Sequence, residues 1–340
     1  MRTYNLCILG FGSIGRALVA LLLKKRQELQ TRYAIDWRLT GLATRRLGWL
    51  ADPAGLDAQG LLRGEMFAAQ ARQEENVQDW LARAEADVFF ELTSLNVETG
   101  EPAISHLRAA LERGAYAITA NKGPVVHAHA DLQEVARQHD TRFLYEGAVM
   151  AGAPIFAMFR DALPASRLLV FRGLLNSTSN VILTEMEGGR TFAEAVQIAQ
   201  EMGITETDPS NDVDGWDATV KLCAISTVLM GIPLKPHQVV RESIRGLSPE
   251  MVHAANAQNK TYRSVGRLER SADSVKASVG PELLKRDDPF ATASPASLIS
   301  HFELDVIPGL TMILHAPSDS DMPRTVAYDV LADWLRALER

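Results

Sequence analysis

The sequence predicts an α/β protein of two domains: a Rossmann-type, doubly wound parallel sheet, followed by a domain of α+β type. Three observations support this fold class. The chain has 340 residues, which is more than one domain usually holds. A strand, a glycine-rich turn and a helix open it, and strands then alternate with helices until about residue 146. We predict a first domain over 1–148, a second over 149–321, and a C-terminal helix, 322–340, that packs back on the first.

The first element is a buried strand over residues 4–9, followed by "GFGSIG" and a helix that starts at Ser13 or Ile14 and runs to about residue 27. Gly10, Gly12 and Gly15 have G-x-G-x-x-G spacing, which allows a tight turn, close approach of a pyrophosphate and close helix packing. The free N–H groups of the helix start would face the phosphates. These five residues are therefore candidate dinucleotide ligands; a glycine turn without a ligand is the alternative.

The second strand, residues 35–43, runs into "TRR". A site that prefers NAD normally carries an acidic residue near the end of this strand, which binds the ribose hydroxyls. Arginine at this place suits a 2′-phosphate, so Arg45 favours NADP over NAD. The alternative is that Arg45 and Arg46 form a solvated turn.

The next elements are a strand within residues 86–94, a helix, and a strand over 116–119. Repetition of strand and helix predicts parallel strands whose carboxyl ends face a common ligand. Thr93, Ser94, Asn121 and Lys122 all fall at such ends, in loops that would lie over the cofactor. Lys122 could instead be an ordinary surface charge, although the following Gly-Pro stiffens its loop.

Beyond residues 146–152 the pattern changes to strands and helices without further glycine turns, and residues 281–297 read as a loop. The last stretch predicts an amphipathic helix. Its apolar positions are Val326, Val330, Leu331, Trp334 and Leu335.

The most acidic stretch is "ITETDPSNDVDGWDATVKL", residues 204–222. Turn residues predict a loop over 206–215, followed by a helix from Trp216 towards Met230. Asp217 and Lys221 would share one face of that helix, which is otherwise almost wholly apolar. Burial lowers the pKa of a lysine and makes it a better proton donor near neutrality, so Lys221 is the candidate general acid. An i,i+4 ion pair without a catalytic role is the alternative.

Bulk composition excludes several classes of protein. A net charge of −7 gives no electrostatic reason to bind nucleic acid or an anionic membrane. The two cysteines, Cys7 and Cys223, lie in apolar surroundings and argue against a disulfide scaffold or a zinc site. The apolar start imitates a signal peptide, but glycines and Arg16 interrupt it and no cleavage pattern follows. We therefore expect an unprocessed, cytoplasmic protein.

Four motifs resemble those of homoserine dehydrogenases, and the resemblance extends over nearly the whole chain. They are the glycine turn, "TANK" at 119–122, "GLLNSTSNVIL" at 173–183 and "EMGITETDPSNDVDGWDATVKL" at 201–222, the last being the most specific. The resemblance implies a homodimer whose second domain binds substrate and which reversibly reduces aspartate semialdehyde to homoserine with NAD(P)H. This reaction belongs to threonine and methionine biosynthesis.

The resemblance also implies roles for individual residues. Lys122 would join Lys221 in the site, to bind substrate and share in proton transfer. Carboxylates would bind the polar end of the substrate, which carries an ammonium group. Two more residues would line the same pocket. The implied substrate residues are Glu206, Asp212, Asp217, Thr178 and Gly203. Oxygen ligands suit a sodium or potassium ion, and the resemblance implies that Glu146, Val149, Ala151 and Ala153 would supply them. The alternative is that this segment is a plain hinge loop.

Two departures from the family pattern bear on specificity. Ser177 replaces a glycine in the usual N-G-T, so a β-carbon narrows the pocket or changes the backbone. The usual C-terminal glycine-rich turn reads "LHAPSDSDMPRTVAYDV" instead. No regulatory domain follows Arg340, so feedback control by threonine through one is not expected. Two other functions stay open: a dehydrogenase for a different small amino acid or hydroxy acid, and a non-catalytic NADP-binding regulator.

Overall fold

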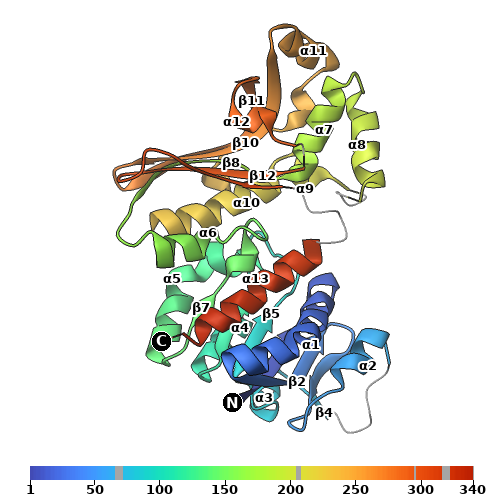
Figure 1. Ribbon diagram of the computed structural model, residues 1–340, viewed down its shortest axis with the longest axis vertical. Coiled ribbons are helices and arrows are strands. Elements are labelled where there is room, and N and C mark those ends of the chain that lie inside the picture. The colour runs from blue at the N-terminus through green and yellow to red at the C-terminus, as the bar shows by residue number, and fades with distance from the viewer. Residues whose placement is uncertain (66–71, 204–207, 295, 316–321, 340) are drawn as a thin grey trace. The chain divides into compact units, whose positions relative to one another are not determined.

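The computed structural model describes all residues except 66–71, 204–207, 295, 316–321 and 340 (Figure 1). The chain divides into two compact units: Met1–Pro154 with Asp321–Arg340, and Ile155–Ser320. The boundary between Pro154 and Ile155 lies a few residues beyond the expected boundary at 148/149. Helix α13 (Met322–Ala337) belongs to the first unit and packs against α1 (Ser13–Tyr33).

The sheet of the first unit has the strand order β4-β3-β2-β1-β5-β6-β7. Its strands are β1 (Arg2–Leu9), β2 (Ile35–Thr44), β3 (Gly48–Ala51), β4 (Arg72–Glu74), β5 (Val88–Glu91), β6 (Tyr116–Thr119) and β7 (Phe143–Leu144). Five neighbouring strands, in the order β2-β1-β5-β6-β7, are parallel, as a doubly wound sheet requires. The sequence did not reveal the antiparallel edge, where β3 folds back on β2 through a turn that ends at Gly48. The φ of Gly48 is +69°, a conformation that glycine adopts without strain.

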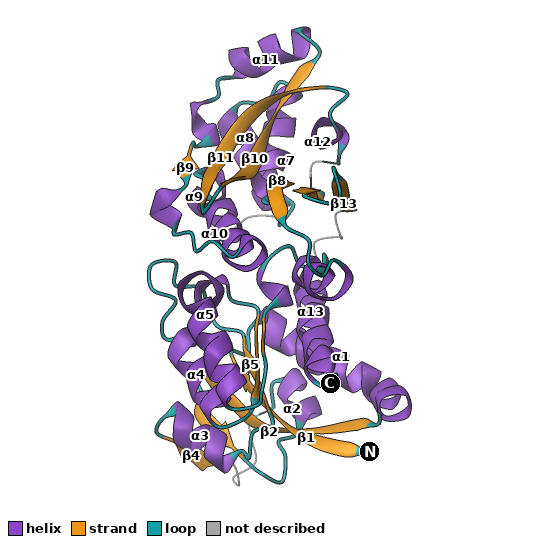
Figure 2. Ribbon diagram, turned by 90° about the vertical axis from the view of Figure 1, so that its left-hand side faces the viewer, coloured by secondary structure: helices purple, strands orange, loops and turns teal. Residues whose placement is uncertain are grey.

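Helices cover both faces of this sheet (Figure 2). On one face lie α1 and α13, and on the other α3 (Val77–Arg83), α4 (Ala103–Glu112) and α5 (Lys122–Gln138), while α2 (Ala58–Arg63) contacts α1. The indole of Trp334 on α13 stacks edge-on against Tyr4 of β1 and Phe90 of β5, with ring centroids 5.8 and 6.3 Å apart. Helix α1 continues past its predicted end near residue 27, and stops where Ala34 adopts a left-handed backbone.

The second unit is built on a sheet with the order β13-β12-β8-β10-β11-β9. Its strands are β8 (Leu168–Leu174), β9 (Val240–Arg241), β10 (Lys260–Ser271), β11 (Ser274–Lys285), β12 (Leu298–Leu304) and β13 (Leu310–Leu314). All neighbouring pairs are antiparallel except β9 with β11. The predicted loop over 281–297 was wrong at its start, because β11 pairs with β10 as far as Lys285. It also contains the short helix α12 (Pro289–Thr292).

The helices of the second unit include one inside the acidic stretch. They are α6 (Ile155–Ala157), α7 (Ser177–Glu187), α8 (Phe192–Glu201), α9 (Ser210–Val213), α10 (Trp216–Ile225) and α11 (Pro249–Ala257). The predicted loop over 206–215 is therefore interrupted by the single turn of α9. Helix α10 continues as a π-helical turn, Ser226–Met230, as far as the sequence predicted. Within the described ranges, no helix is both long and apolar enough to cross a membrane.

Candidate active site

The glycine turn between β1 and α1 has a different steric demand at each glycine. Gly10 has φ +98°, and a β-carbon there would lie 2.4 Å from the carbonyl oxygen of Leu92. A β-carbon at Gly15 would lie 2.3 Å from the carbonyl oxygen of Gly10. At Gly12 no described atom lies within 4 Å of that position, so the turn is open there. Helix α1 begins after Gly12 without a side-chain cap, which leaves the N–H groups of its first turn to face a ligand.

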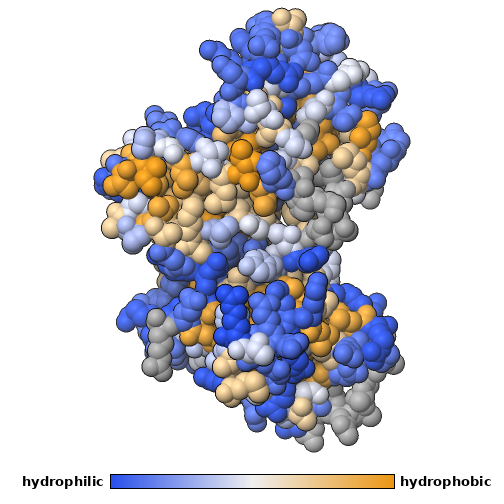
Figure 3. Space-filling model, viewed as in Figure 1, coloured by the Kyte–Doolittle hydropathy of each residue, from blue (hydrophilic) through white to orange (hydrophobic). Residues whose placement is uncertain are grey.

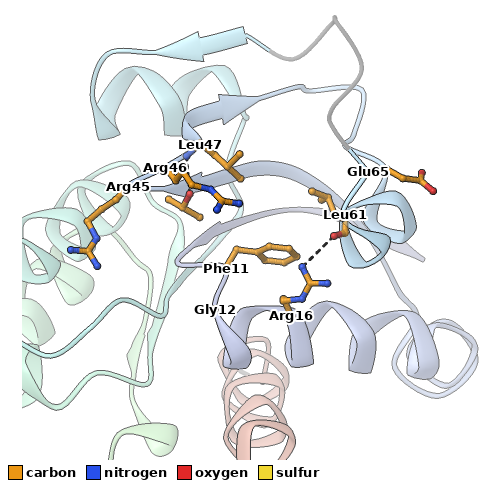
Figure 4. A pocket seen from close by; sticks show the side chains of 10 residues that line it. Phe11, Gly12, Arg16, Arg45, Arg46, Leu47, Leu61 and Glu65 are labelled. Atoms are coloured by element: carbon orange, nitrogen blue, oxygen red, sulfur yellow. Dashed lines mark hydrogen bonds between the residues drawn. The ribbon is translucent and has the colours of Figure 1, made fainter. Parts of the chain in front are cut away.

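One pocket beside this turn is lined by three arginines (Figure 4). It has a volume of about 490 Å³ and extends between α1, the β2–β3 turn and α2. The Arg16 guanidinium donates to the carbonyl oxygen of Leu62 at 2.5 Å. Arg46 points towards Phe11 and Arg16, whereas Arg45 points away from them. The sequence singled out Arg45, but the arrangement makes Arg46 and Arg16 equally strong candidates for a phosphate.

A second pocket, of about 560 Å³, shares Gly12 and Arg45 with the first and extends along the carboxyl ends of the strands. Thr93 and Ser94 line it, together with the aromatic pair Trp49 and His106, whose ring centroids are 5.4 Å apart. Burial lowers the pKa of His106. A neutral imidazole and an indole form an apolar wall of the kind that accommodates a nucleobase.

Lys122 begins α5, and its backbone is fixed by tight packing on both sides. Asn121 caps the helix, because its side-chain oxygen accepts from the N–H of Gly123 at 3.0 Å. A β-carbon at Gly123 would lie 2.9 Å from the α-carbon of Gly100, so only glycine fits there. Lys122 therefore projects from a rigid helix start at the carboxyl edge of the sheet.

In the second unit, Asp212, Asp217 and Lys221 are brought together by Asn176. The Asn176 amide donates to Asp212 at 2.6 Å and to Asp217 at 3.2 Å. Its oxygen accepts from the N–H of Ser179, which caps α7. Asn176 is 6% exposed, so this amide is fixed in position. Sequence reasoning quoted the motif around Asn176 but gave the residue no role.

The Lys221 ammonium is held by two oxygen atoms. It forms an ion pair with Asp217 at 2.7 Å and donates to the carbonyl oxygen of Leu175 at 2.6 Å. The Lys221 side chain is 15% exposed, so one end of it is still accessible. The i,i+4 ion pair that the sequence offered as an alternative is therefore present. Lys221 is therefore part of a polar cluster with Asp217, Asn176 and Asp212.

The other two described carboxylates of the acidic stretch stabilise the loop itself. Asp208 accepts from the Ser210 hydroxyl at 2.6 Å, which lowers its pKa. Burial alone would raise the pKa of Asp214, but hydrogen bonds from Ser243 and Arg245 outweigh it and leave the pKa lowered. The carboxylates of this stretch therefore have two different roles. Asp212 and Asp217 belong to the cluster with Lys221, whereas Asp208 and Asp214 stabilise the loop.

The remaining predicted substrate residues differ in how the structure places them. Thr178 is 3% exposed and lies in the first turn of α7, next to Asn176. Gly203 follows α8 with φ +72° and is exposed. Glu206 lies outside the described residues. Ser177 is an ordinary first residue of α7 and is absent from the left-handed residues of the described chain, so its β-carbon imposes no backbone strain.

The predicted cation loop, 146–153, is tied to α13 by buried carboxylates. Glu146 is 2% exposed, and its N–H donates to Asp333 at 2.6 Å. The N–H of Gly152 donates to Asp329 at 2.8 Å. Arg336 lies 3.8 Å from the Glu146 carboxylate. Val149, Ala151 and Ala153 are buried.

Negative charge accumulates around this loop. Burial raises the pKa of Asp329 to about 7, and repulsion from Glu146 adds to the rise, against the Gly152 hydrogen bond. No group of three His, Cys, Asp or Glu side chains in the described part of the chain could hold a metal ion. A cation here would consequently need Glu146 and backbone carbonyls.

Comparison with known proteins covers both units. Residues 154–335 match the family model for homoserine dehydrogenase, and residues 10–146 match the model for the NAD-binding domain of homoserine dehydrogenase. An NAD(+)-dependent homoserine dehydrogenase of Pseudomonas canavaninivorans is 37% identical over 319 residues, 92% of this chain and 91% of the relative. A homoserine dehydrogenase of Methanocaldococcus jannaschii is 29% identical, with 96% and 97% covered. The crystal structure of a homoserine dehydrogenase from Thiobacillus denitrificans has a TM-score of 0.82 at 26% identity, covering 99% of this chain and 74% of that one.

Proposed function

The chain belongs to the homoserine dehydrogenase family, and we propose that it interconverts aspartate semialdehyde and homoserine with Lys221 as the proton donor. It is an NAD(P)-dependent oxidoreductase that acts on CH–OH groups. The observation that carries the assignment of Lys221 is its ammonium, held between Asp217 and the Leu175 carbonyl with part of the side chain exposed.

The residues of the second unit would divide the work as follows. The nicotinamide, when bound, would supply a hydride to the aldehyde carbon, which leaves the negative charge on the oxygen. Lys221 would protonate that oxygen, and the ion pair with Asp217 would hold the amine in position. Asp212, fixed by Asn176, would accept the ammonium group of the substrate. For substrate binding, Thr178, Gly203 and Glu206 remain proposals on the basis of their motifs, and so does Lys122 of the first unit.

A substitution at Lys221 tests the assignment. We expect Lys221→Ala to lose about 10²- to 10⁴-fold in aspartate-semialdehyde-dependent NADPH oxidation, the usual range for a general acid. Binding of NADPH, measured by its fluorescence, should be unchanged. Lys276→Ala, at an exposed position of β11, is the matched control. Full turnover of the Lys221 variant would remove the proposed role.

The alternative specificity is tested with the same absorbance assay. Asp212 and Asp217 favour a substrate with an ammonium group, so homoserine should be oxidised and hydroxy acids without that group should not. Turnover of such a hydroxy acid in place of homoserine would establish the second dehydrogenase function. Binding of NADPH without any turnover across the panel would establish the regulatory one.

We propose that the cofactor is bound by Gly10, Gly12, Ser13, Ile14 and Gly15, with Thr93, Ser94 and Lys122 at the strand ends. NADP is favoured because Arg45 and Arg46 are exposed and line the same pocket as Arg16. The Pseudomonas relative is described as NAD(+)-dependent, so the preference needs direct measurement. The ratio of kcat/KM for NADPH to that for NADH decides it.

We also propose a monovalent cation, Na⁺ or K⁺, at Glu146 and the carbonyls of Val149, Ala151 and Ala153. The support is the cluster of buried carboxyl groups, with Glu146 on the loop and Asp329 and Asp333 on α13. Thermal stability should then rise with NaCl or KCl above its value in tetramethylammonium chloride at the same ionic strength. Equal stability in the three salts would oppose a cation site.

Assembly and compartment are proposals of the same kind. The sheet of the second unit leaves Leu283 and Ile313 exposed, as is Val306 in the turn between β12 and β13, and apolar surface gathers over this unit (Figure 3). Exposed apolar area of this kind favours a homodimer, and sedimentation equilibrium should give twice the monomer mass. Cys7 and Cys223 are free and buried, which favours a cytoplasmic protein.

A further inference from the structure

A buried glutamate outside the predicted site residues connects the two loops that carry Thr93 and Lys122. Glu91 is the last residue of β5 and is 0% exposed. It stands level with Leu9, the last residue of β1, and with Thr119, the last residue of β6. Glu91 therefore sits at the centre of the carboxyl edge of the parallel sheet.

Each oxygen of the Glu91 carboxylate serves a different loop. One oxygen accepts from the Thr93 N–H at 2.9 Å and also from the Thr93 hydroxyl. The other oxygen accepts from the Thr119 hydroxyl at 2.7 Å. The loop after β5 and the end of β6 are thus joined through one side chain.

The connection continues to the start of α5. The Thr119 hydroxyl accepts from the N–H of Asn121 at 2.9 Å, and the Asn121 side chain caps α5 at Gly123. The Asn121 amide also donates to the carbonyl oxygen of Ser94 at 3.4 Å. Lys122 stands between Asn121 and Gly123, so its backbone position depends on this chain of hydrogen bonds.

A carboxylate is an expensive group to bury for a purely structural link. Burial raises the pKa of Glu91, and hydrogen bonds from Thr119, Thr93 and Asn121 counter the rise. These partners are hydroxyl, amide and backbone groups rather than a cation. An apolar residue would fill the same space at lower cost, but it could not accept from both loops at once.

We propose that Glu91 is a positioning residue, which holds Thr93 and Lys122 in register at the cofactor end of the sheet through Thr119. The proposal rests on the proposed function, because it assigns that edge to the cofactor. Glu91 would act through these residues and would not touch the reacting atoms. A leucine of similar size could accept from neither loop.

Three variants and a control test the proposal. Thr119→Val removes the hydroxyl that links Glu91 to Asn121, Thr119→Ser restores it, and Glu91→Leu breaks the link at its other end. Thr141→Val is the matched control. The Thr141 hydroxyl is also buried and donates to the Ala115 carbonyl at 2.8 Å, but at the opposite, amino end of the sheet.

We expect Thr119→Val and Glu91→Leu to lower kcat by about 10- to 100-fold, as misplacement of site groups does. The serine variant should stay near wild type, and so should the control, although the control also loses a buried hydrogen bond. Hydrogen exchange should accelerate at residues 92–94 and 119–123 in the slow variants and not in the control.

Two outcomes would overturn the proposal. The first is a Thr119→Val enzyme whose kcat and exchange rates match those of Thr141→Val, which would reduce the network to ordinary stability. The second is a serine variant as slow as the valine variant. If the wild-type protein neither bound nor oxidised NAD(P)H, the proposed function would fail instead, and the exchange rates alone would then decide whether Glu91 joins the loops.

Discussion

Replacing Asp329 with asparagine should stabilise the protein, and increasingly so as the pH rises. Asp329 is 4% exposed and accepts the N–H of Gly152. Glu146 lies on the loop it holds, Asp333 is one helical turn away on α13, and Arg336 supplies the nearby positive charge. An asparagine keeps the acceptor for Gly152 and the shape of the side chain. It removes only the charge that burial disfavours.

The size of the effect follows from the shift in the pKa of Asp329. The pKa is about 7 in the folded protein, against an ordinary aspartate pKa of 3.8. The unfolded chain therefore loses its proton first, and the folded state loses stability between pH 4 and pH 7. Three pKa units correspond to about 4 kcal/mol, an upper value for the loss at pH 8. Below pH 4 the carboxyl is protonated in both states, and the two proteins should be equally stable.

Melting temperatures at pH 5, 6, 7 and 8 measure this difference, in tetramethylammonium chloride so that no Na⁺ or K⁺ neutralises the carboxylates. Each kcal/mol should move the melting temperature by roughly 2–4 °C in a unit of this size. Asp131→Asn, at an exposed position of α5, is the control and should show a small, nearly constant shift. A gain for Asp329→Asn that does not grow with pH, or a loss at pH 8, would refute the reasoning.

Three further predictions concern the carboxylate cluster, the cofactor pocket and the two buried cysteines. Asn176→Ala should lower kcat/KM for aspartate semialdehyde by about 10- to 100-fold, because two hydrogen bonds to carboxylates are lost; wild-type kcat/KM would show that Asn176 does not position them. Arg46→Ala should raise the KM for NADPH by about 10- to 100-fold and leave that for NADH unchanged, whereas equal effects on both would exclude a 2′-phosphate contact. Burial raises the pKa of Cys7 and of Cys223 to about 12. Mass spectrometry should therefore find both thiols unmodified by iodoacetamide at pH 8 until the protein is unfolded, and rapid labelling of the native protein would contradict their burial.

Local sequence determined the elements whose physics is local. The glycine spacing predicted the turn after β1, because the backbone at Gly15 passes close to the carbonyl oxygen of Gly10, five residues earlier. The apolar runs predicted β1, β5 and β6 as buried strands. The residues that follow β5 and β6 include the candidate cofactor ligands Thr93, Ser94 and Lys122. The i,i+4 spacing fixed Asp217 and Lys221 on one helical face, which a helix imposes wherever it lies in the fold.

Only the tertiary structure decided how segments distant in sequence meet. Asn176 joins Asp212 to Asp217 because α7 begins beside the acidic stretch, and no local pattern encodes that approach. Asp329 looks like an ordinary polar position of an amphipathic helix until α13 docks and buries it against Gly152. Burial and pairing set the charge of such groups, and both depend on packing between elements. The sequence therefore predicted which residues are candidates for the chemistry, while the packing determined which of them are connected and at what cost.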